Sequence, residues 1–208
     1  MKKLLFLLTL MLLGAGNLHV MAQDEQRELP RNTISLNVGP GLVTSEIVTY
    51  RGFTPTKYRT SSSLDYVLSY EHLYSDGFGF GVEVSQMHID RDGCLNLFYV
   101  GPKAVYAKML SPKWRFHVSL GLGYAADDGN MGYTADGSTD WDNLLHGIGT
   151  VDNVGFDYRF NRHFGVGAQI RSMVTIFPKH SGYSKKEGRF VREGIDNVSL
   201  QFGARYYF

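Results

Sequence analysis

The last twelve residues of the chain, 197–208, alternate between apolar and polar side chains. One face carries Val198, Leu200, Phe202, Ala204, Tyr206 and Phe208. The other face carries Asn197, Ser199, Gln201, Gly203 and Arg205, and Tyr207 is its aromatic exception. An alternation with a period of two predicts one extended strand with an apolar face and a polar face.

The same alternation recurs in seven earlier segments, so the sequence predicts about eight strands. A length of roughly 9–11 residues fits a strand that crosses a bilayer at a tilt. The seven segments begin near Asn32, Leu64, Phe78, Leu95, Trp114, Leu145 and Phe164.

The connections between these strands alternate between long and short ones. Tight turns are predicted at Ser75-Asp76-Gly77, Ser111-Pro112-Lys113 and Asn161-Arg162. Longer polar connections fall near residues 44–63, 90–93, 125–143 and 178–196. An even strand number with short turns on one side and long loops on the other is typical of an all-β, transmembrane, antiparallel up-and-down barrel. We therefore predict four long outer loops, three short periplasmic turns and both termini in the periplasm.

The N-terminal segment predicts export from the cytoplasm. Lys2 and Lys3 precede an apolar run, Leu4 to Leu13, and Val20-Met21-Ala22 offers a cleavage region. This is the layout of a secretory signal peptide, and the run is shorter than the roughly 20 apolar residues of a membrane helix. We assign residues 1–22 to a signal peptide, 23–31 to a periplasmic lead-in and 32–208 to the barrel domain.

Charge and cysteine content narrow the possible functions. The chain carries 21 Lys and Arg against 20 Asp and Glu, a balance that gives no attraction to nucleic acid. Its mean hydropathy of −0.18 is compatible with a membrane barrel, because only every second residue of a strand meets lipid. Cys94 is the only cysteine, so an intramolecular disulfide is excluded.

Alternation alone does not decide which face is inside, because a soluble barrel would turn its apolar face inward. Three features favour the opposite orientation. The polar face is rich in glycine, which suits the crowded interior of an eight-stranded barrel; these are Gly79, Gly81, Gly121, Gly123, Gly155, Gly165, Gly167 and Gly203. Large aromatic residues stand beside the short turns, as in a membrane-interface girdle; these are Tyr74, Phe78, Trp114, Phe160, Phe164, Tyr206 and Phe208. Finally, an exported chain ends on an aromatic residue.

The polar face also carries charges of both signs. Burying a charge is costly unless the charge is paired, so we predict a paired internal network that plugs the lumen. Its members are Glu71, Glu83, Lys103, Arg115, Asp157, Arg159, Arg171 and Arg205. A purely structural role is one interpretation. The other is a gated pore, in which an exchange of partners opens a water path.

Asp152 does not fit this scheme, because the alternation places it on the lipid face of its strand together with Thr150. A charge near the bilayer centre is costly. A bulge near Val151 would turn Asp152 inward, and the sequence leaves both arrangements open.

Two long loops carry charged clusters. The third loop holds carboxylates that could ligate calcium, although they lack EF-hand spacing and solvation is the simpler interpretation; they are Asp127, Asp128, Asp136, Asp140 and Asp142. The fourth loop is basic and could contact lipopolysaccharide phosphates, the acidic third loop or solvent alone; its basic residues are Lys179, Lys185, Lys186, Arg189 and Arg192.

The signal peptide, the strand count and the terminal Tyr206-Tyr207-Phe208 resemble the small eight-stranded outer-membrane β-barrel family, of the OmpA and OmpX type, including the similar barrel domains common in Bacteroidetes-like bacteria. The resemblance covers the whole mature chain. It implies that Phe202, Tyr206 and Phe208 form a C-terminal insertion signal for the outer-membrane assembly machinery. It also implies a location in the cell outer membrane, in contact with its lipid and lipopolysaccharide.

Some barrels of this family modify lipid A with a Ser–His pair that a carboxylate orients. His180, Ser181 and Glu187 stand close in the fourth loop, but adjacent residues of an extended chain point to opposite sides. The histidines show no metal-ligand spacing. We therefore predict no enzyme activity, no cofactor and no metal.

The family includes structural supports, adhesins and small pores, so the fold does not fix the function. We expect a non-enzymatic integral barrel that supports the envelope or contacts other surfaces through its extracellular loops, with an extracellular ligand that the sequence does not identify. The alternatives are a narrow gated pore and, third, a lipid A-modifying enzyme.

Overall fold

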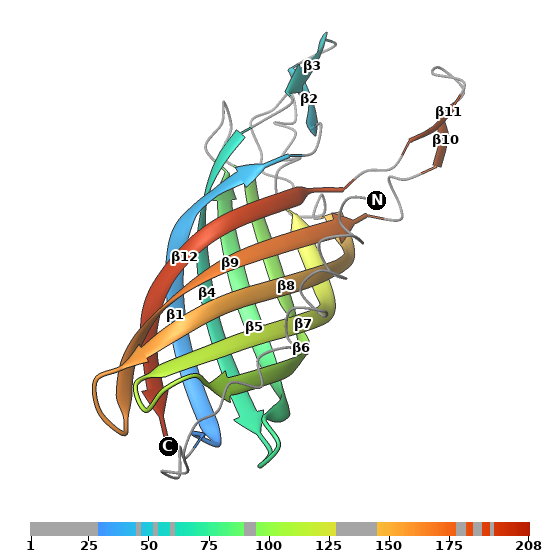
Figure 1. The fold of residues 1–208 in the computed structure, drawn as a ribbon. Helices are drawn as coiled ribbons and strands as arrows, with labels where there is room; N and C mark the ends of the chain where they lie inside the picture. Colours follow the sequence, from blue (N-terminus) through green and yellow to red (C-terminus); the bar gives the residue numbers. More distant parts are fainter. Residues whose placement is uncertain are drawn as a thin grey trace.

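The computed structural model describes residues 29–44, 47–51, 54–58, 61–89, 95–127, 145–177, 182–184, 189–191 and 194–208. In this part of the chain, eight long antiparallel strands form a barrel and four short strands form two hairpins (Figure 1). The barrel strands are β1 (Asn32–Val43), β4 (Ser61–Leu73), β5 (Phe78–Ile89), β6 (Leu95–Met109), β7 (Trp114–Asp127), β8 (Leu145–Arg159), β9 (Phe164–Ile176) and β12 (Asp196–Tyr207). None of the described residues forms a helix long and apolar enough to cross a membrane.

The barrel closes because its first and last strands pair with each other. β1 pairs with β12 so that, for example, Ile34 faces Tyr206 and Leu42 faces Val198. The strand order is β1-β12-β9-β8-β7-β6-β5-β4, and β4 pairs back onto β1. Closure gives the backbone polar groups of the strands partners within the barrel, as a bilayer interior requires. The predicted up-and-down transmembrane barrel of eight strands is confirmed.

Three tight turns join the strands at the end of the barrel where the chain ends (Figure 1). In the β4–β5 turn Gly77 has a φ of 88°, a left-handed conformation that favours glycine. The Asp76 carboxylate accepts a hydrogen bond from the Phe78 N–H at 3.1 Å. In the β8–β9 turn the Asn161 side-chain oxygen accepts one from the Phe164 N–H at 2.8 Å. Local turn chemistry therefore sets where the strands reverse.

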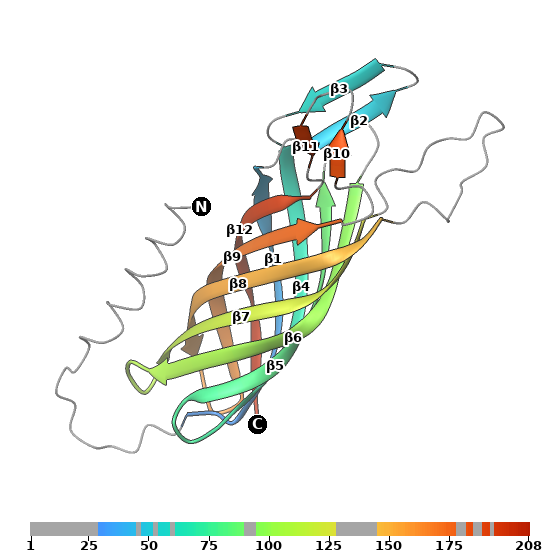
Figure 2. The same ribbon diagram turned by 90° about the vertical axis from the view of Figure 1, so that its right-hand side faces the viewer.

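Two hairpins extend from the opposite end of the barrel (Figures 1 and 2). They pair β2 (Ile47–Arg51) with β3 (Thr54–Tyr58) and β10 (Gly182–Ser184) with β11 (Arg189–Val191). Residues 44–63 and 178–196 were predicted as loops, and for these strands the prediction is wrong. The β-branched residues within 47–51 favour a strand, although the Gly, Pro and Ser residues nearby are typical of turns.

Apolar side chains cover the outside of the barrel. Successive residues of each strand alternate between buried and exposed, and Leu36, Leu120 and Ile170 are 60%, 61% and 58% exposed. The aromatic residues predicted beside the short turns are all exposed and form a rim at that end: Tyr74, Phe78, Trp114, Phe160, Phe164, Tyr206 and Phe208. An apolar exterior with an aromatic rim suits acyl chains and an interface. The predicted outward orientation of the apolar face is confirmed.

Removal of β12 should prevent folding, because β1 and β9 would both lose their ladder partner and the barrel would have open edges. A chain truncated after Ile195 should lack the heat-modifiable form that a detergent-extracted closed barrel shows in gel electrophoresis. The control is Leu200→Ala, which shortens one lipid-facing side chain of β12 and keeps the backbone ladder. A heat-modifiable truncated chain would contradict the closed fold.

Candidate functional site

Inward-pointing side chains fill the lumen of the barrel in three layers. A small apolar layer lies nearest the short turns, charged and polar side chains form the middle, and a larger apolar layer lies nearest the hairpins. An eight-stranded barrel has an interior just wide enough for side chains. The candidate site predicted from the sequence is the middle layer.

The charged side chains of the middle layer form one continuous series of ion pairs, which we call the luminal charge chain. Its first half begins with Arg205 Nε, which lies 2.8 Å from Asp157 Oδ1. Asp157 Oδ2 lies 3.1 Å from Arg115 Nη1, and Arg115 Nη2 lies 2.8 Å from Glu71 Oε2. All four side chains are buried. They come from β12, β8, β7 and β4, so the contacts cross the lumen.

The second half of the luminal charge chain starts at the other oxygen of Glu71. Lys103 Nζ lies 2.9 Å from Glu71 Oε1 and 3.7 Å from Glu83 Oε2. Arg171 Nε lies 3.0 Å from Glu83 Oε1, and Arg171 Nη1 lies 3.8 Å from Asp65 Oδ2. The complete series runs Arg205, Asp157, Arg115, Glu71, Lys103, Glu83, Arg171 and Asp65, and seven of the eight barrel strands contribute to it.

Positive and negative groups alternate along the whole luminal charge chain, so four bases balance four acids. Neutral side chains add hydrogen bonds: Asn153 donates to Glu83 at 3.0 Å, and Arg171 donates to the Ser85 hydroxyl at 2.7 Å. Taking ions out of water is costly, and only close pairing with further hydrogen bonds offsets that cost. In the luminal charge chain, close pairing and further hydrogen bonds offset part of this cost.

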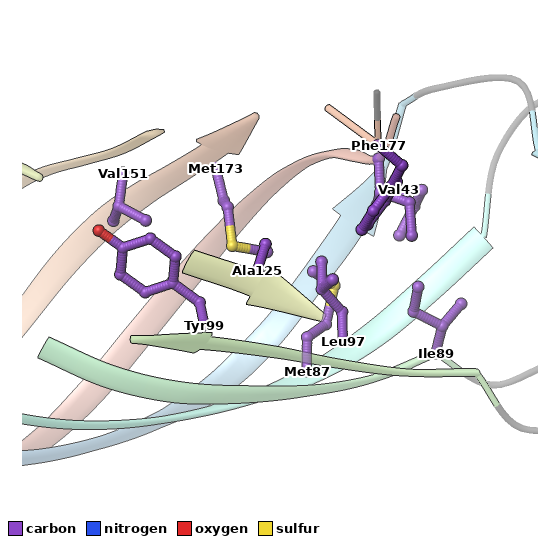
Figure 3. Close-up of a cluster of buried hydrophobic side chains, with 10 residues drawn as sticks. Val43, Met87, Ile89, Leu97, Tyr99, Ala125, Val151, Met173 and Phe177 are labelled. Carbon is purple, nitrogen blue, oxygen red and sulfur yellow. The ribbon is translucent and has the colours of Figure 1, made fainter. Parts of the chain in front are cut away.

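Ten buried hydrophobic residues form the upper apolar layer, between the luminal charge chain and the hairpin end (Figure 3). They are Val43, Met87, Ile89, Leu97, Tyr99, Ala125, Val151, Met173, Phe177 and Ile195. This layer is not among the features predicted from the sequence. The available signal is that inward positions change from polar to apolar towards the outer end of a strand, as when Glu83 and Ser85 are followed by Met87 and Ile89 on β5.

Tyr99 occupies lumen space that glycines leave open. A Cβ on Gly101 or Gly121 would stand 2.7 Å or 2.9 Å from the Tyr99 hydroxyl, and a Cβ on Gly149 would stand 3.1 Å from its ring. Such distances are too short for ordinary contacts, so the barrel wall must lack side chains where the ring lies. The glycine-rich inner face predicted from the sequence has this physical cause in the upper layer.

The lower apolar layer lies in the lumen near the short turns. Leu73, Val105 and Ala107 are buried there, and Leu29, which precedes β1, packs against them. The Leu73 N–H donates a hydrogen bond to the Arg31 carbonyl at 2.7 Å. The segment directly before the first strand therefore helps to cap the lumen.

The structure brings seven of the eight predicted network residues together in the luminal charge chain. Arg159 lies apart from them near the short turns, where its guanidinium carbon is 5.3 Å from the centre of the Tyr207 ring. Asp65 completes the chain instead, and Asn197 donates to it at 2.8 Å. Asp65 is absent from the network predicted from the sequence, although the strand period places it on the same face as Glu71.

The residues predicted to form the C-terminal insertion signal lie on the outer face of β12. Phe202, Tyr206 and Phe208 are all exposed there. The Tyr206 ring contacts the Phe208 ring with centroids 5.6 Å apart. Their position suits recognition from the membrane side, and their role in insertion stays a prediction.

Asp152 lies on the outside of the barrel. The β7–β8 and β8–β9 registers run through this position without interruption and give it Leu120 and Ser172 as partners. Val151 points inward and is 1% exposed. No bulge turns Asp152 into the lumen, so the lipid-facing arrangement is correct.

Several sequence candidates lie outside the described residues, and the expectations about them stay predictions. They are the signal peptide, Cys94, the loop carboxylates Asp128, Asp136, Asp140 and Asp142, the loop bases Lys179, Lys185, Lys186 and Arg192, and the trio His180, Ser181 and Glu187. Asp127 is described and is buried at the end of β7. Arg189 begins β11. Among the described side chains, no group of three or more His, Cys, Asp or Glu is placed to hold a metal ion.

Comparison with known proteins bears on the fold. No protein-family model and no curated protein sequence matches the chain. Neisserial surface protein A has a similar structure, with a TM-score of 0.60 and 13% identity over 85% of this chain and 97% of that one. The outer membrane protein OprG from Pseudomonas aeruginosa has a TM-score of 0.50 and 14% identity over 88% of this chain and 98% of that one.

A third similar structure is the outer membrane enzyme PagL, with a TM-score of 0.44 and 15% identity over 82% of this chain and 97% of that one. That similarity is too low to argue from. The first two matches confirm that the chain has the fold of the small outer-membrane β-barrels. Together with the apolar exterior, this fold places the protein in the outer membrane, as the sequence predicted.

Loss of one acid from the luminal charge chain should be more harmful than loss of an opposite pair. Asp157 lies between Arg115 and Arg205, so Asp157→Asn should lower the free energy of unfolding by about 3–5 kcal/mol. Combining it with Arg205→Met removes the terminal pair and leaves three bases against three acids, so the double variant should be more stable than Asp157→Asn alone. Urea unfolding in lipid vesicles measures both, and a double variant that is less stable than the single one would contradict the charge-balance argument.

Proposed function

We propose that the protein is a sealed, non-enzymatic barrel of the outer membrane, and that the segments at its hairpin end carry its role in envelope support or surface contact. The observation behind the proposal is the filling of the lumen by two apolar layers with the luminal charge chain between them. Each layer opposes the passage of ions and water in a different way.

The upper apolar layer opposes conduction because a pore needs a continuous polar path. Its members come from β1, β5, β6, β7, β8 and β9, from Phe177 directly after β9 and from Ile195 directly before β12, so they meet from nearly the whole wall. Met87, Tyr99 and Met173 are at most 1% exposed. A hydrated ion would lose its water there, and apolar constrictions close channels by dewetting. An exchange of partners in the luminal charge chain would leave this layer in place, which counts against the gated pore.

The chemistry of the middle layer also favours a structural role. The ion-paired side chains are at most 6% exposed and are bound to each other across the lumen. A general acid, base or nucleophile has to reach a substrate. These groups reach only their partners, so they serve stability rather than catalysis.

The hairpin end is the part of the described chain that offers surfaces for contact. β2 with β3 and β10 with β11 form sheets of two strands each, beyond the barrel (Figure 2). The outer edges of such sheets carry backbone groups that can bind an extended segment of a partner. Loops held by a rigid scaffold commonly carry binding functions.

Planar-bilayer recording tests the seal. The folded protein should give no stable single-channel steps. The double variant Tyr99→Ala with Met173→Ala should also give no steps. It removes two large side chains from the upper apolar layer, but the luminal charge chain still fills the middle of the lumen. Stable steps from the unaltered protein would overturn the sealed-barrel proposal in favour of the pore.

Complementation of a strain lacking the protein separates support from surface contact. A variant in which a Gly-Ser linker replaces residues 47–58 should keep its heat-modifiable fold, because β2 and β3 pair only with each other. If this variant restores detergent resistance to the strain, the barrel itself supports the envelope. Adhesion lost with this variant assigns contact to the hairpin. A change in lipid A mass that depends on the protein would overturn the non-enzymatic assignment.

A further inference from the structure

Asp152 breaks the apolar exterior of the barrel. It is paired in register with Leu120 of β7, four residues from Tyr124 towards one end and six from Trp114 towards the other. Both aromatic side chains are exposed near the ends of β7. Among the described barrel strands, the only other acidic outward side chain is Asp196, which stands at the first residue of β12. A carboxyl group therefore lies within the band that faces acyl chains.

Asp152 makes no ion pair or hydrogen bond with any described residue. On β9 it faces Ser172, whose hydroxyl also lies on the outer face. Polar groups in hydrocarbon are costly without a partner, and such residues most often face another protein surface. The pair therefore makes the wall formed by β8 and β9 a candidate surface for contact with another protein.

The side chains around this pair allow close approach of another wall. The outward residues directly next to the pair on β8 and β9 are Thr150, Val154, Ile170 and Val174, and none is aromatic; Phe156 is the next outward residue of β8. The opposite wall, formed by β4 and β5, carries exposed aromatic residues instead: Tyr66, Tyr70 and Phe80. Small and β-branched residues with a few polar ones are typical of contacts between membrane-spanning elements.

We propose that two copies of the chain associate side by side through the outer face of β8 and β9, with Asp152 of each copy accepting a hydrogen bond from the partner's Ser172. Two copies inserted in the same direction are related by an axis along the membrane normal. Such an axis sets β8 of one copy against the partner's β9. Because Asp152 and Ser172 are register partners, they lie at nearly the same depth, and the contact is self-complementary as a twofold interface requires.

A second copy fits this face better than other occupants. Acyl chains offer no hydrogen-bond donor within the apolar band. A different protein would need its own donor at the depth of Asp152. A second copy supplies that donor at the correct depth because its Ser172 occupies the same position in the same fold.

Cysteine cross-linking between two differently tagged copies tests the geometry. In a Cys94→Ser background, one copy carries Thr150→Cys and the other Val174→Cys, which are the next outward register pair and leave Asp152 and Ser172 intact. Mild oxidation in membranes should link the two tagged copies. The control pair is Leu68→Cys with Val84→Cys on the opposite wall. Equal yields at the two walls would overturn the proposal.

Asp152→Leu separates a specific contact from chance proximity. It replaces the carboxyl group by a side chain that suits lipid, so the barrel should still fold, as heat-modifiable migration would show. Two polar pairs of about 1 kcal/mol each correspond to roughly a 30-fold change in association. Cross-linking at β8 and β9 should fall by roughly that factor.

Photobleaching of single labelled complexes in dilute supported bilayers gives an independent readout. The unaltered chain should bleach mainly in two steps and Asp152→Leu mainly in one. Single-step bleaching of the unaltered chain, or cross-linking that Asp152→Leu leaves unchanged, would overturn the proposal.

Discussion

The structure depends on the narrowness of a lumen that eight strands enclose. A barrel of this size has room for side chains and little else, so a charge on the inner face must be satisfied by another side chain. The alternating order of the luminal charge chain follows from this constraint. Each inner member, such as Arg115 between Asp157 and Glu71, is held by two opposite charges, and only Arg205 and Asp65 are terminal. Both terminal groups bind amides, Asn37 and Asn197 respectively. The wall strands are thereby tied across the lumen as well as along their ladders.

The same constraint explains the composition of the other layers. Where the wall carries glycine, as at Gly101 and Gly121, the space is taken by one large ring, Tyr99. Where the inner positions carry Met and Leu, no polar group requires a partner and packing alone fills the lumen. The barrel thus combines an ionic middle, which fixes the side chains in one arrangement, with apolar ends that exclude water from it. Exclusion of water strengthens the ion pairs, because their attraction is greater in a medium of low dielectric constant.

The strands, their faces and the short turns could be predicted from the sequence, because each depends on neighbouring residues. The period-two alternation predicts the inward position of Glu71 and Arg171, and Asp76-Gly77 predicts a turn. Which charges meet could not be predicted, since Arg115 on β7 reaches Glu71 on β4 only when closure and register bring those strands opposite. Asp65 was not predicted as a member of the network. The predicted network held five bases and three acids, and such an imbalance would leave buried bases without an acidic partner in a closed lumen. Counting inward charges for neutrality would have pointed to a further acid, and Asp65 lies on the inner face of β4.

The placement of Asp152 is consistent with this view of the interior. The inner charges of this barrel are closely paired with each other. Asn153, the residue directly after Asp152, points inward, so an acid at that position would face the lumen. The fold therefore has no steric need for an outward acid here. The continuous register around Asp152 shows that the strand makes no local adjustment to hide it. In the proposed dimer, the carboxyl group is satisfied by a partner outside the barrel. Pairing across the lumen and pairing between barrels would then be two solutions to one problem, a charged group that water cannot reach.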